Sequence, residues 1–322
     1  MIMVNLRKFI EKINTEAKFS GLLSFNELMS GHTTFKVGGK ADVWIQPGKD
    51  IFPSYASKLL RAAAREGIPV FILGAGANIV VSDRGIRGIV LDSGAWSGIG
   101  KTTKKQIKRT VSYSVNVLSG TSVDLLAERL AGRGLGGLEF LAGMPGSIGG
   151  AVWMNARCYE KSVSDVLMET EILDEDLKRQ KIPFRAEDFS YKKSPFQGRN
   201  VLILSARFAV EPGKPVEIRR EMAEHRRDRE EKGHYRYPSA GSAFKNNRDF
   251  GEPTGKIIAD LGLRGLASGG AQLAPWHGNI IINTGHARAV DIKNLMEELA
   301  RRVKKEKGFE LESEILFAGD WI

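Results

Sequence analysis

The chain has 322 residues, 42% of them hydrophobic and 27% charged, which is typical of a soluble globular protein large enough for two domains. No run of about twenty apolar residues is present, which excludes a conventional membrane helix, and the charged N-terminus lacks the apolar core of a signal peptide. The single cysteine, Cys158, excludes an internal disulfide framework and favours a reducing cytoplasm. A formal net charge of +10 favours anionic partners. Because acids interleave with the basic runs and neither a nucleic-acid module nor zinc-type spacing occurs, we expect a small-molecule anion, and no nucleic acid, membrane or metal.

Hydrophobic periodicity predicts alternating helices and strands in the first two thirds of the chain. In chain order we expect a helical N-terminal segment at 1–30, a strand at 36–46, a helix at 51–66, strands at 70–73, 85–91 and 107–118, a helix at 121–133 capped by Thr121, and strands at 166–173 and 201–210.

The pattern changes after a Pro- and Gly-containing stretch at 211–215. We then expect a charged helix at 216–232, a helix at 254–261, a strand at 278–283, an amphipathic helix at 290–307 and a final strand at 311–317. These elements predict a mixed α/β protein of the α+β class with two domains that divide near residues 211–216.

Two glycine-rich segments are candidate phosphate cradles. The first, Leu-Gly-Ala-Gly-Ala-Asn at 73–78, directly follows an apolar strand, and small residues there let backbone N–H groups approach a phosphate. Taken alone, this segment is about equally consistent with a tight turn. The second segment, at 137–155, places four glycines and a proline within residues 143–150, an irregular backbone that suits a pyrophosphate or the edge of a flavin ring.

Two further segments carry polar residues in unusual settings. Ser242 lies in Tyr-Pro-Ser-Ala-Gly-Ser-Ala-Phe-Lys-Asn at 237–246, beside a lysine and an amide. In the predicted final strand, alternation places Glu312 and Glu314 on one face, which is unusual for a purely structural strand.

The ordered set of these segments resembles the UDP-N-acetylenolpyruvoylglucosamine reductases, the MurB family. The motifs occur in the family's order. They extend from position 32 to Glu314, so the resemblance covers nearly the whole chain. The matching segments are the double-glycine strand entry at 32–41, the loop at 74–78, GMPGSIGGAVWMNA at 143–156, Tyr-x-x-Ser at 191–194, AGSAFKN at 240–246 and Glu314.

This resemblance implies an FAD-binding domain of the vanillyl-alcohol-oxidase (PCMH) type with two subdomains at 31–212, and a smaller substrate-binding domain at 213–322. In the family reaction NADPH reduces FAD, the flavin hydride then goes to the methylene carbon of the enolpyruvyl ether, and a proton is added at the adjacent carbon. The product is UDP-N-acetylmuramate, a precursor for peptidoglycan synthesis. The resemblance also implies a cytoplasmic enzyme, which we expect to be a monomer.

By motif match, Ser242 donates the proton, Glu314 supports it at the enolpyruvyl group, and Lys192 occupies the position of a catalytic arginine. The residues expected at the substrate are Tyr191, Arg229, Lys245 and Asn246. The residues expected at FAD are Gly74, Ala75, Gly76, Ala77, Asn78, Gly120, Gly143, Pro145, Gly146, Ser147, Gly149, Gly150 and Asn155.

The sequence departs from the family pattern at two places. The family has Tyr-Arg-x-Ser where this chain has Tyr-Lys-Lys-Ser at 191–194, and lysine keeps the charge but not the planar bidentate fork. Either Lys192 substitutes, or one of Arg226, Arg227 and Arg229 provides the fork. The second departure is Arg-Cys-Tyr-Glu at 157–160, where Gly-Ala-Tyr-Gly is usual. The short span between Ser194 and Ser242 leaves no room for an extra tyrosine-bearing loop, which indicates the subgroup without it.

Two alternative functions share this pattern. One is another FAD-dependent oxidoreductase of the same fold, against which the C-terminal matches argue. The other is a catalytically weakened nucleotide-sugar binder, for which Lys192 is the only support.

Overall fold

The computed structural model describes residues 6–107 and 110–321 and has two compact units that the chain enters more than once. Unit 1 comprises the described residues up to Ser24, then Val43–Ala75 and Gly88–Arg226. Unit 2 comprises Phe25–Asp42, Gly76–Arg87 and the described residues from Arg227 onward. Compact units and functional domains are different divisions of a chain, so the domain boundaries given above stay predictions.

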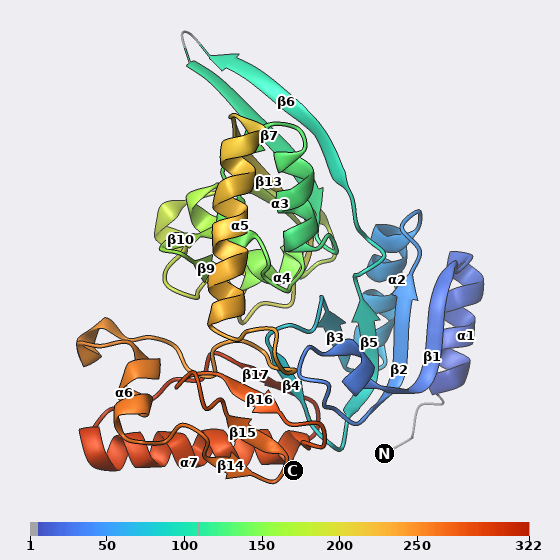
Figure 1. Ribbon diagram of the computed structural model, residues 1–322. Coiled ribbons are helices and arrows are strands. Elements are labelled where there is room, and N and C mark those ends of the chain that lie inside the picture. Colours follow the sequence, from blue (N-terminus) through green and yellow to red (C-terminus); the bar gives the residue numbers. More distant parts are fainter. Residues whose placement is uncertain (1–5, 108–109, 322) are drawn as a thin grey trace. The chain divides into compact units, whose positions relative to one another are not determined.

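A four-stranded sheet is formed by β1 (Gly21–Leu28), β2 (Lys40–Pro47), β5 (Ile86–Asp92) and β3 (Val70–Leu73), in that order, with β3 and β5 parallel. Helix α1 (Leu6–Ala17) packs against α2 (Phe52–Arg65) beside it (Figure 1). The buried residues Tyr55, Leu59 and Ala63 recur every four positions along α2 and form its inner face. Gly67, at φ +65°, ends the helix in the left-handed conformation that glycine tolerates best.

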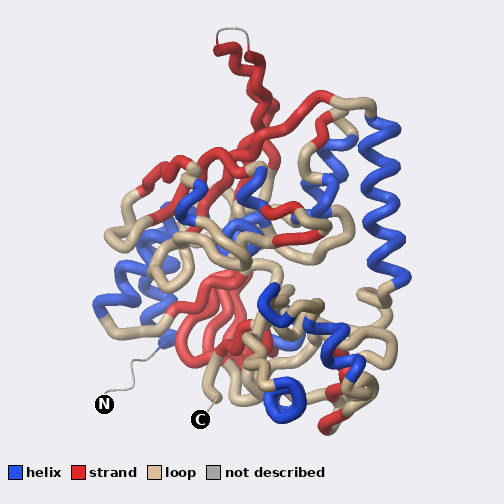
Figure 2. Tube along the Cα trace, turned by 90° about the vertical axis from the view of Figure 1, so that its left-hand side faces the viewer, coloured by secondary structure: helices blue, strands red, loops and turns tan. Residues whose placement is uncertain are grey.

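The larger sheet of unit 1 is antiparallel. Its order is β12 (Arg179–Pro183), β11 (Leu167–Leu173), β13 (Leu202–Pro212), β7 (Thr110–Leu118) and β6 (Ile99–Ile107), with β8 (Leu135–Gly136) also paired to β13. Strands β6 and β7 form the long ribbon that projects at the top of Figure 2. Side chains from this sheet, from α3 (Val123–Ala131) and from α4 (Ile148–Trp153) form the core, including Val117, Leu126, Ile148 and Phe208.

The charged helix α5 (Pro215–Glu231) lies beside α3 (Figure 1). Ile218 and Met222 are its buried residues in a cluster with Ala127 and Ala131. Arg226 pairs with both Asp124 and Glu128 of α3, so charge as well as apolar contact joins the two helices. Between α4 and β11 the chain forms a short hairpin of β9 (Arg157–Cys158) and β10 (Lys161–Ser162).

Unit 2 is built on helix α7 (Ala289–Lys307), which runs along a three-stranded antiparallel sheet of β14 (Ala267–Ser268), β15 (Ala271–Leu273) and β16 (Ile281–Asn283) (Figure 1). Ile292, Leu295 and Leu299 form its buried face. A parallel pair, β4 (Ile79–Val81) with β17 (Leu316–Ala318), and the short helix α6 (Thr254–Asp260) complete the unit.

Most predicted elements are present within a few residues, and the predicted α+β class is confirmed. Three local predictions are wrong, and a long strand was missed. The segment at 1–30, which was expected to be helical, contains the strand β1 at Gly21–Leu28. The N-cap of α3 is Ser122, whereas the hydroxyl of Thr121 donates to Gly98 O at 3.2 Å. The final strand begins at Leu316, and residues 311–315 form only one bridge, between Ser313 and Phe244. Strand β6 was not expected, because its lysine-rich sequence lacks an apolar pattern.

Some predicted segments extend beyond the described residues. Positions 1–5 of the N-terminal segment and positions 108–109 of the strand expected at 107–118 lie outside them. Within the described ranges, no helix has both the length and the apolarity needed to cross a bilayer.

Candidate active site

The loop at 74–78 follows β3 and begins in close contact with α4. A Cβ atom on Gly74 would lie 2.4 Å from Ser147 Oγ, so this approach requires glycine. Ser147 is the N-cap of α4 and accepts a hydrogen bond from Gly150 N at 3.3 Å. The two glycine-rich segments that the sequence singled out therefore meet within unit 1.

The rest of this loop belongs to unit 2. Gly76 has φ +61°, and a Cβ atom there would lie 2.0 Å from His32 O. Within the described part of the chain, no group accepts a hydrogen bond from the backbone N–H of Ala75, Gly76 or Ala77. Such N–H groups are suited to phosphate oxygens. The side chain of Asn78 instead bonds within unit 2, donating from Nδ2 to Glu314 O at 2.9 Å.

The segment at 143–150 is held against the end of β7 by backbone hydrogen bonds. Gly149 N donates to Ser119 O at 2.8 Å, and Gly143 N donates to Asp124 Oδ1 at 2.7 Å. Gly120 packs against Ser93, whose carbonyl oxygen lies 2.0 Å from where a Cβ atom would be. Pro145 is exposed, and Gly146 is partly exposed with φ +149°.

Ser119 gives a direct test of whether these residues suit FAD. Its Oγ is buried and has no hydrogen-bond partner among the described residues, which is a costly state for a hydroxyl unless a bound group completes it. Ser119 is followed by Gly120, where the backbone leaves no room for a side chain, and its Cβ lies 3.0 Å from where a Cβ atom on Gly149 would be. An orphaned hydroxyl among glycines fits a polar, phosphate-bearing cofactor such as FAD.

Asn155 has a different environment from the one expected of a cofactor ligand. Its side chain is buried and bridges two backbone groups, donating to Ser190 O at 2.9 Å and accepting from Ser164 N at 3.0 Å. These bonds give Asn155 a structural role, and contact with FAD stays a prediction.

The Tyr-Lys-Lys-Ser segment lies beside Asn155. Ser194 is buried and donates from Oγ to Trp153 O at 2.6 Å, which anchors the segment to α4. Lys192 has φ +58°, and its Nζ lies 6.0 Å from the ring centre of Tyr191. A cavity of about 280 Å³ opens at this place, and Asn155, Arg157, Ser190 and Tyr191 are among the residues that line it.

Unit 2 brings the Ser242 and Glu314 segments together. Glu314 N donates to Ala243 O and Lys245 N donates to Glu312 O, both at 2.9 Å, on either side of the bridge between Phe244 and Ser313. On its other edge the segment pairs through Ser242 with Ile280 of unit 2. The hydroxyl of Ser242 makes no hydrogen bond to any described residue, and Ser242 is partly exposed.

Lys245 and Asn246 are both engaged locally. Lys245 Nζ pairs with Glu312, and the lysine side chain is only 15% exposed. Asn246 Oδ1 accepts from Thr254 N at 2.9 Å at the start of α6. A phosphate contact by Lys245 would compete with the largely exposed carboxylate of Glu312.

Arg229 is buried at 7% exposure and contributes to an unusual electrostatic environment. Burial lowers the pKa of His234 to about 4, and the positive charge of Arg229 adds to that shift. Burial also lowers the pKa of His277, whose ring centre lies 6.1 Å from that of His234. Of the arginines proposed to replace the fork at position 192, Arg226 is held by two carboxylates, whereas Arg227 is exposed.

Known proteins resemble both parts of this chain. Residues 233–318 match the family model described as "UDP-N-acetylenolpyruvoylglucosamine reductase, C-terminal domain", and residues 54–181 match the model of an FAD binding domain. The UDP-N-acetylenolpyruvoylglucosamine reductase of Treponema denticola is 39% identical over 96% of this chain and 97% of its own length. The chain belongs to the UDP-N-acetylenolpyruvoylglucosamine reductase family.

Other members of the family match this chain with similar identity and coverage. The enzyme of Treponema pallidum is 37% identical over 92% of this chain and 93% of its own length. The crystal structure of the MurB reductase of Thermus caldophilus superposes with a TM-score of 0.72 at 31% identity, covering 93% of this chain and 99% of that one. These matches confirm the predicted MurB resemblance, its fold class and its FAD-binding domain.

Two residues at the site escaped sequence reasoning. Ser119 gives no local signal, because a serine at the end of a strand is ordinary and only the structure reveals its orphaned hydroxyl. Arg157 was noted only as a departure in a loop, although it lines the cavity beside Tyr191. The signal that could have identified Arg157 is a basic residue at a position where the family has glycine.

Proposed function

We propose that this protein is an FAD- and NADPH-dependent reductase that converts UDP-N-acetylglucosamine enolpyruvate to UDP-N-acetylmuramate for peptidoglycan synthesis. The observation that carries the proposal is the pairing of residues 243–245 with residues 312–314 in unit 2. Glu314 N donates to Ala243 O, so the expected partner Glu314 is held beside the residue that follows the expected proton donor, Ser242. Family membership over nearly the whole chain supports the same reaction.

In unit 1 we assign Gly74, Ala75, Gly120, the glycines at 143–150 and Ser147 to FAD, and in unit 2 we assign the N–H groups of Gly76 and Ala77 to it. A Cβ atom on Gly74 or Gly120 would lie 2.4 or 2.0 Å from a neighbouring atom, so these two positions admit only glycine. FAD, when bound and reduced by NADPH, would supply the hydride that reduces the enolpyruvyl group. The protein's own contribution is to hold the cofactor, exclude water and stabilise charge.

Hydride addition to an enolpyruvyl ether develops negative charge that spreads onto the pyruvyl carboxylate, so cations and hydrogen-bond donors are needed there. We place Lys192 at that carboxylate and Ser242 at the carbon that takes the proton. A serine hydroxyl is a weak acid, so Ser242 relies on donors and cations around it. Glu314 supports it from the neighbouring segment.

The remaining assignments concern substrate binding. We place Lys245 and Asn246 at the substrate diphosphate, with Arg229 and Tyr191 also contacting the substrate. The FAD-binding domain is assigned to residues 31–212 and the substrate-binding domain to 213–322. The protein is further proposed to be a cytoplasmic monomer of the subgroup without the extra tyrosine loop.

The half-reactions test this function separately. The purified protein should be yellow, NADPH should bleach the flavin absorbance in a stopped-flow experiment, and UDP-N-acetylglucosamine enolpyruvate should then restore it. A protein that stays colourless after incubation with FAD contradicts the whole proposal. A flavin that NADPH bleaches but this substrate never reoxidises points to another FAD-dependent oxidoreductase or to a weakened nucleotide-sugar binder.

A further inference from the structure

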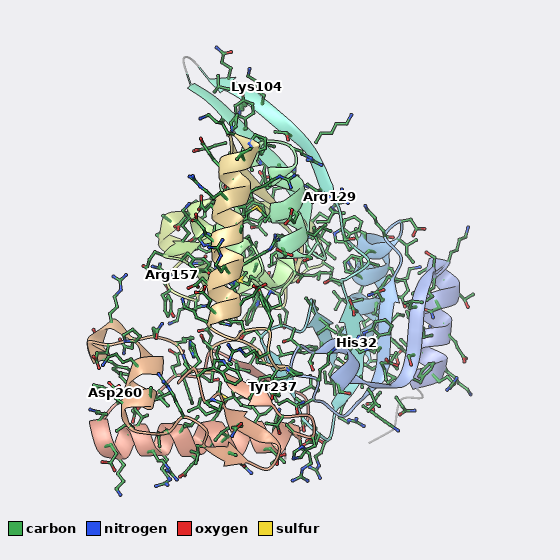
Figure 3. The ribbon with its side chains drawn as sticks, viewed as in Figure 1. His32, Lys104, Arg129, Arg157, Tyr237 and Asp260 are labelled. Atoms are coloured by element: carbon green, nitrogen blue, oxygen red, sulfur yellow. The ribbon has the colours of Figure 1, made fainter. Side chains whose placement is uncertain are left out.

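Two departures from the family pattern meet at one place in unit 1. Lysine stands at 192 where the family has arginine, and arginine stands at 157 where the family has glycine. Arg157, which Figure 3 labels, begins β9. It lines the cavity of about 280 Å³ together with Tyr191, the neighbour of Lys192. The guanidinium that position 192 lacks is therefore present at Arg157, on the wall of the cavity that Tyr191 also lines.

The guanidinium of Arg157 is placed to exchange partners. Its side chain is only 25% exposed, and it pairs with Glu160, whose carboxylate is 88% exposed. A solvated carboxylate holds its partner weakly, so a substrate anion can replace it. The acid on the cavity wall, Asp165, already accepts a hydrogen bond from Ser162 N at 2.8 Å. Of the residues that line this cavity, all of them described, Arg157 is the only basic one.

Lys192 adds a second cation at the same place. Its Nζ lies 6.0 Å from the ring centre of Tyr191, which lines the cavity. An ammonium is a point charge, whereas a guanidinium matches a carboxylate with two parallel N–H bonds. The cavity thus has the guanidinium of Arg157 on its wall, and the ammonium of Lys192 lies beside Tyr191, one of its lining residues.

We propose that Arg157 binds the carboxylate of the enolpyruvyl substrate and takes over the guanidinium function that position 192 lacks. The inference rests on the proposed function, because it concerns the same reaction. Arg226 does not compete for this role, since Asp124 and Glu128 both bind it. As negative charge spreads onto the carboxylate during reduction, Arg157 stabilises it in a partly enclosed setting.

The experiment follows both half-reactions of the full-length holoenzyme by stopped-flow absorbance. The variants are Arg157→Ala, Arg157→Lys, Lys192→Arg and the double variant Arg157→Ala/Lys192→Arg. Arg199→Ala is the matched control, because Arg199 also pairs with a glutamate, Glu175, on the surface of unit 1 and outside the cavity. Titration of the oxidised flavin spectrum with substrate gives a dissociation constant that does not depend on turnover.

We expect Arg157→Ala to slow reoxidation of the flavin by about 10- to 100-fold, because the substrate carboxylate loses a pair of charged hydrogen bonds. The variant should also bind substrate more weakly. Reduction by NADPH should not change. Arg157→Lys should also be slow, because lysine has no fork. Arg157→Ala/Lys192→Arg should recover most of the lost rate, because it restores a guanidinium at the family position.

Two results would overturn the assignment. One is a rate of reoxidation in Arg157→Ala within about twofold of the wild type, or no slower than in Arg199→Ala. The other is a double variant no faster than Arg157→Ala. If Arg157→Ala loses its flavin, Arg157→Lys, which keeps charge and length, decides the question by the same comparison. A wild-type flavin that the enolpyruvyl substrate fails to reoxidise would refute the proposed function itself, and with it the role of Arg157.

Discussion

The side-chain amide of Asn78 donates a hydrogen bond to the main-chain carbonyl of Glu314 at 2.9 Å. The end of the glycine-rich loop is thereby tied to the segment that carries the expected partner of Ser242. Strand β4 begins directly after Asn78 and β17 begins two residues after Glu314, and the two strands pair in parallel. One side chain therefore connects the loop expected to bind FAD to the segment expected to bind substrate within unit 2.

Replacing Asn78 with alanine should affect both stability and the second half-reaction. The lost hydrogen bond predicts a decrease of about 1 kcal/mol in the free energy of unfolding, measured by urea denaturation. Reoxidation of the flavin by substrate should slow, because the Glu314 backbone loses an anchor. Asn247→Ala is the control, since the side chain of Asn247 also makes a hydrogen bond to the backbone, accepted from Asp249 N, but in an exposed turn. Equal behaviour of the two variants would show that the Asn78 link has no role in catalysis.

Gly74→Ala should reduce FAD binding. The new Cβ atom would lie 2.4 Å from Ser147 Oγ, and such overpacking typically costs about 1–3 kcal/mol. Flavin retained after gel filtration and FAD affinity measured by fluorescence quenching give the result.

A second substitution can relieve that clash. Ser147 Cβ lies 3.6 Å from the added Cβ position, so Gly74→Ala/Ser147→Ala has only an ordinary contact. The double variant should therefore bind FAD better than Gly74→Ala, although the loss of the α4 cap costs about 1 kcal/mol of stability. Gly31→Ala, with no atom near its added Cβ, is the control. Normal FAD affinity in Gly74→Ala would contradict the prediction.

Ser242→Ala should separate the two half-reactions. Reduction by NADPH should stay unchanged, whereas reoxidation by the enolpyruvyl substrate should slow by about 10²- to 10⁴-fold, the usual contribution of a positioned acid. Ser268→Ala, at the short strand β14, is the matched control. Equal slowing of both half-reactions by Ser242→Ala would reject its assignment as proton donor.

Elements with a strong local pattern could be predicted from the sequence. The helix α7 follows from apolar residues at helical spacing, and β3 and β5 from short apolar runs bounded by glycine or proline. The strand β6 could not be predicted in this way, because pairing with β7 along nearly its whole length forms it, and its own residues are mostly polar. The final strand was extended too far, since residues 311–315 are held by one bridge rather than by a ladder.

The candidate site was predictable as a set of motifs but not as an arrangement. The sequence places Gly74 and Ser147 in separate motifs, and only the fold shows that one excludes a side chain because of the other. Asp83 was not singled out at all. Its carboxylate accepts hydrogen bonds from Ala289 N at 2.8 Å and Val290 N at 3.0 Å, a distant cap that no local pattern reveals.

Asp83→Ala should destabilise unit 2 through this cap. Two N–H groups in the first turn of α7 lose their acceptor, so the free energy of unfolding should fall by about 1–2 kcal/mol. Asp83→Asn keeps one acceptor oxygen and should lose less. Asp42→Ala, which breaks an exposed pair with Arg87, controls for the loss of a surface charge. If Asp83→Ala unfolds at the same urea concentration as Asp42→Ala, the cap contributes nothing measurable.

The lowered pKa of His234 predicts how the stability of the protein depends on pH. Burial, with the positive charges of Arg229, His277 and Lys232, lowers its pKa from 6.5 to about 4 in the folded protein. The unfolded chain therefore binds a proton more readily than the folded one, and stability is lost as pH falls from 6.5 towards about 4. The free energy of unfolding, measured with urea at about pH 7.5 and about pH 5, should decrease less in His234→Gln than in the wild type, because the variant has no proton to gain there. His286→Gln replaces an exposed histidine and should keep the wild-type difference. An unchanged difference in His234→Gln would mean that another group, such as His277, accounts for the acid sensitivity.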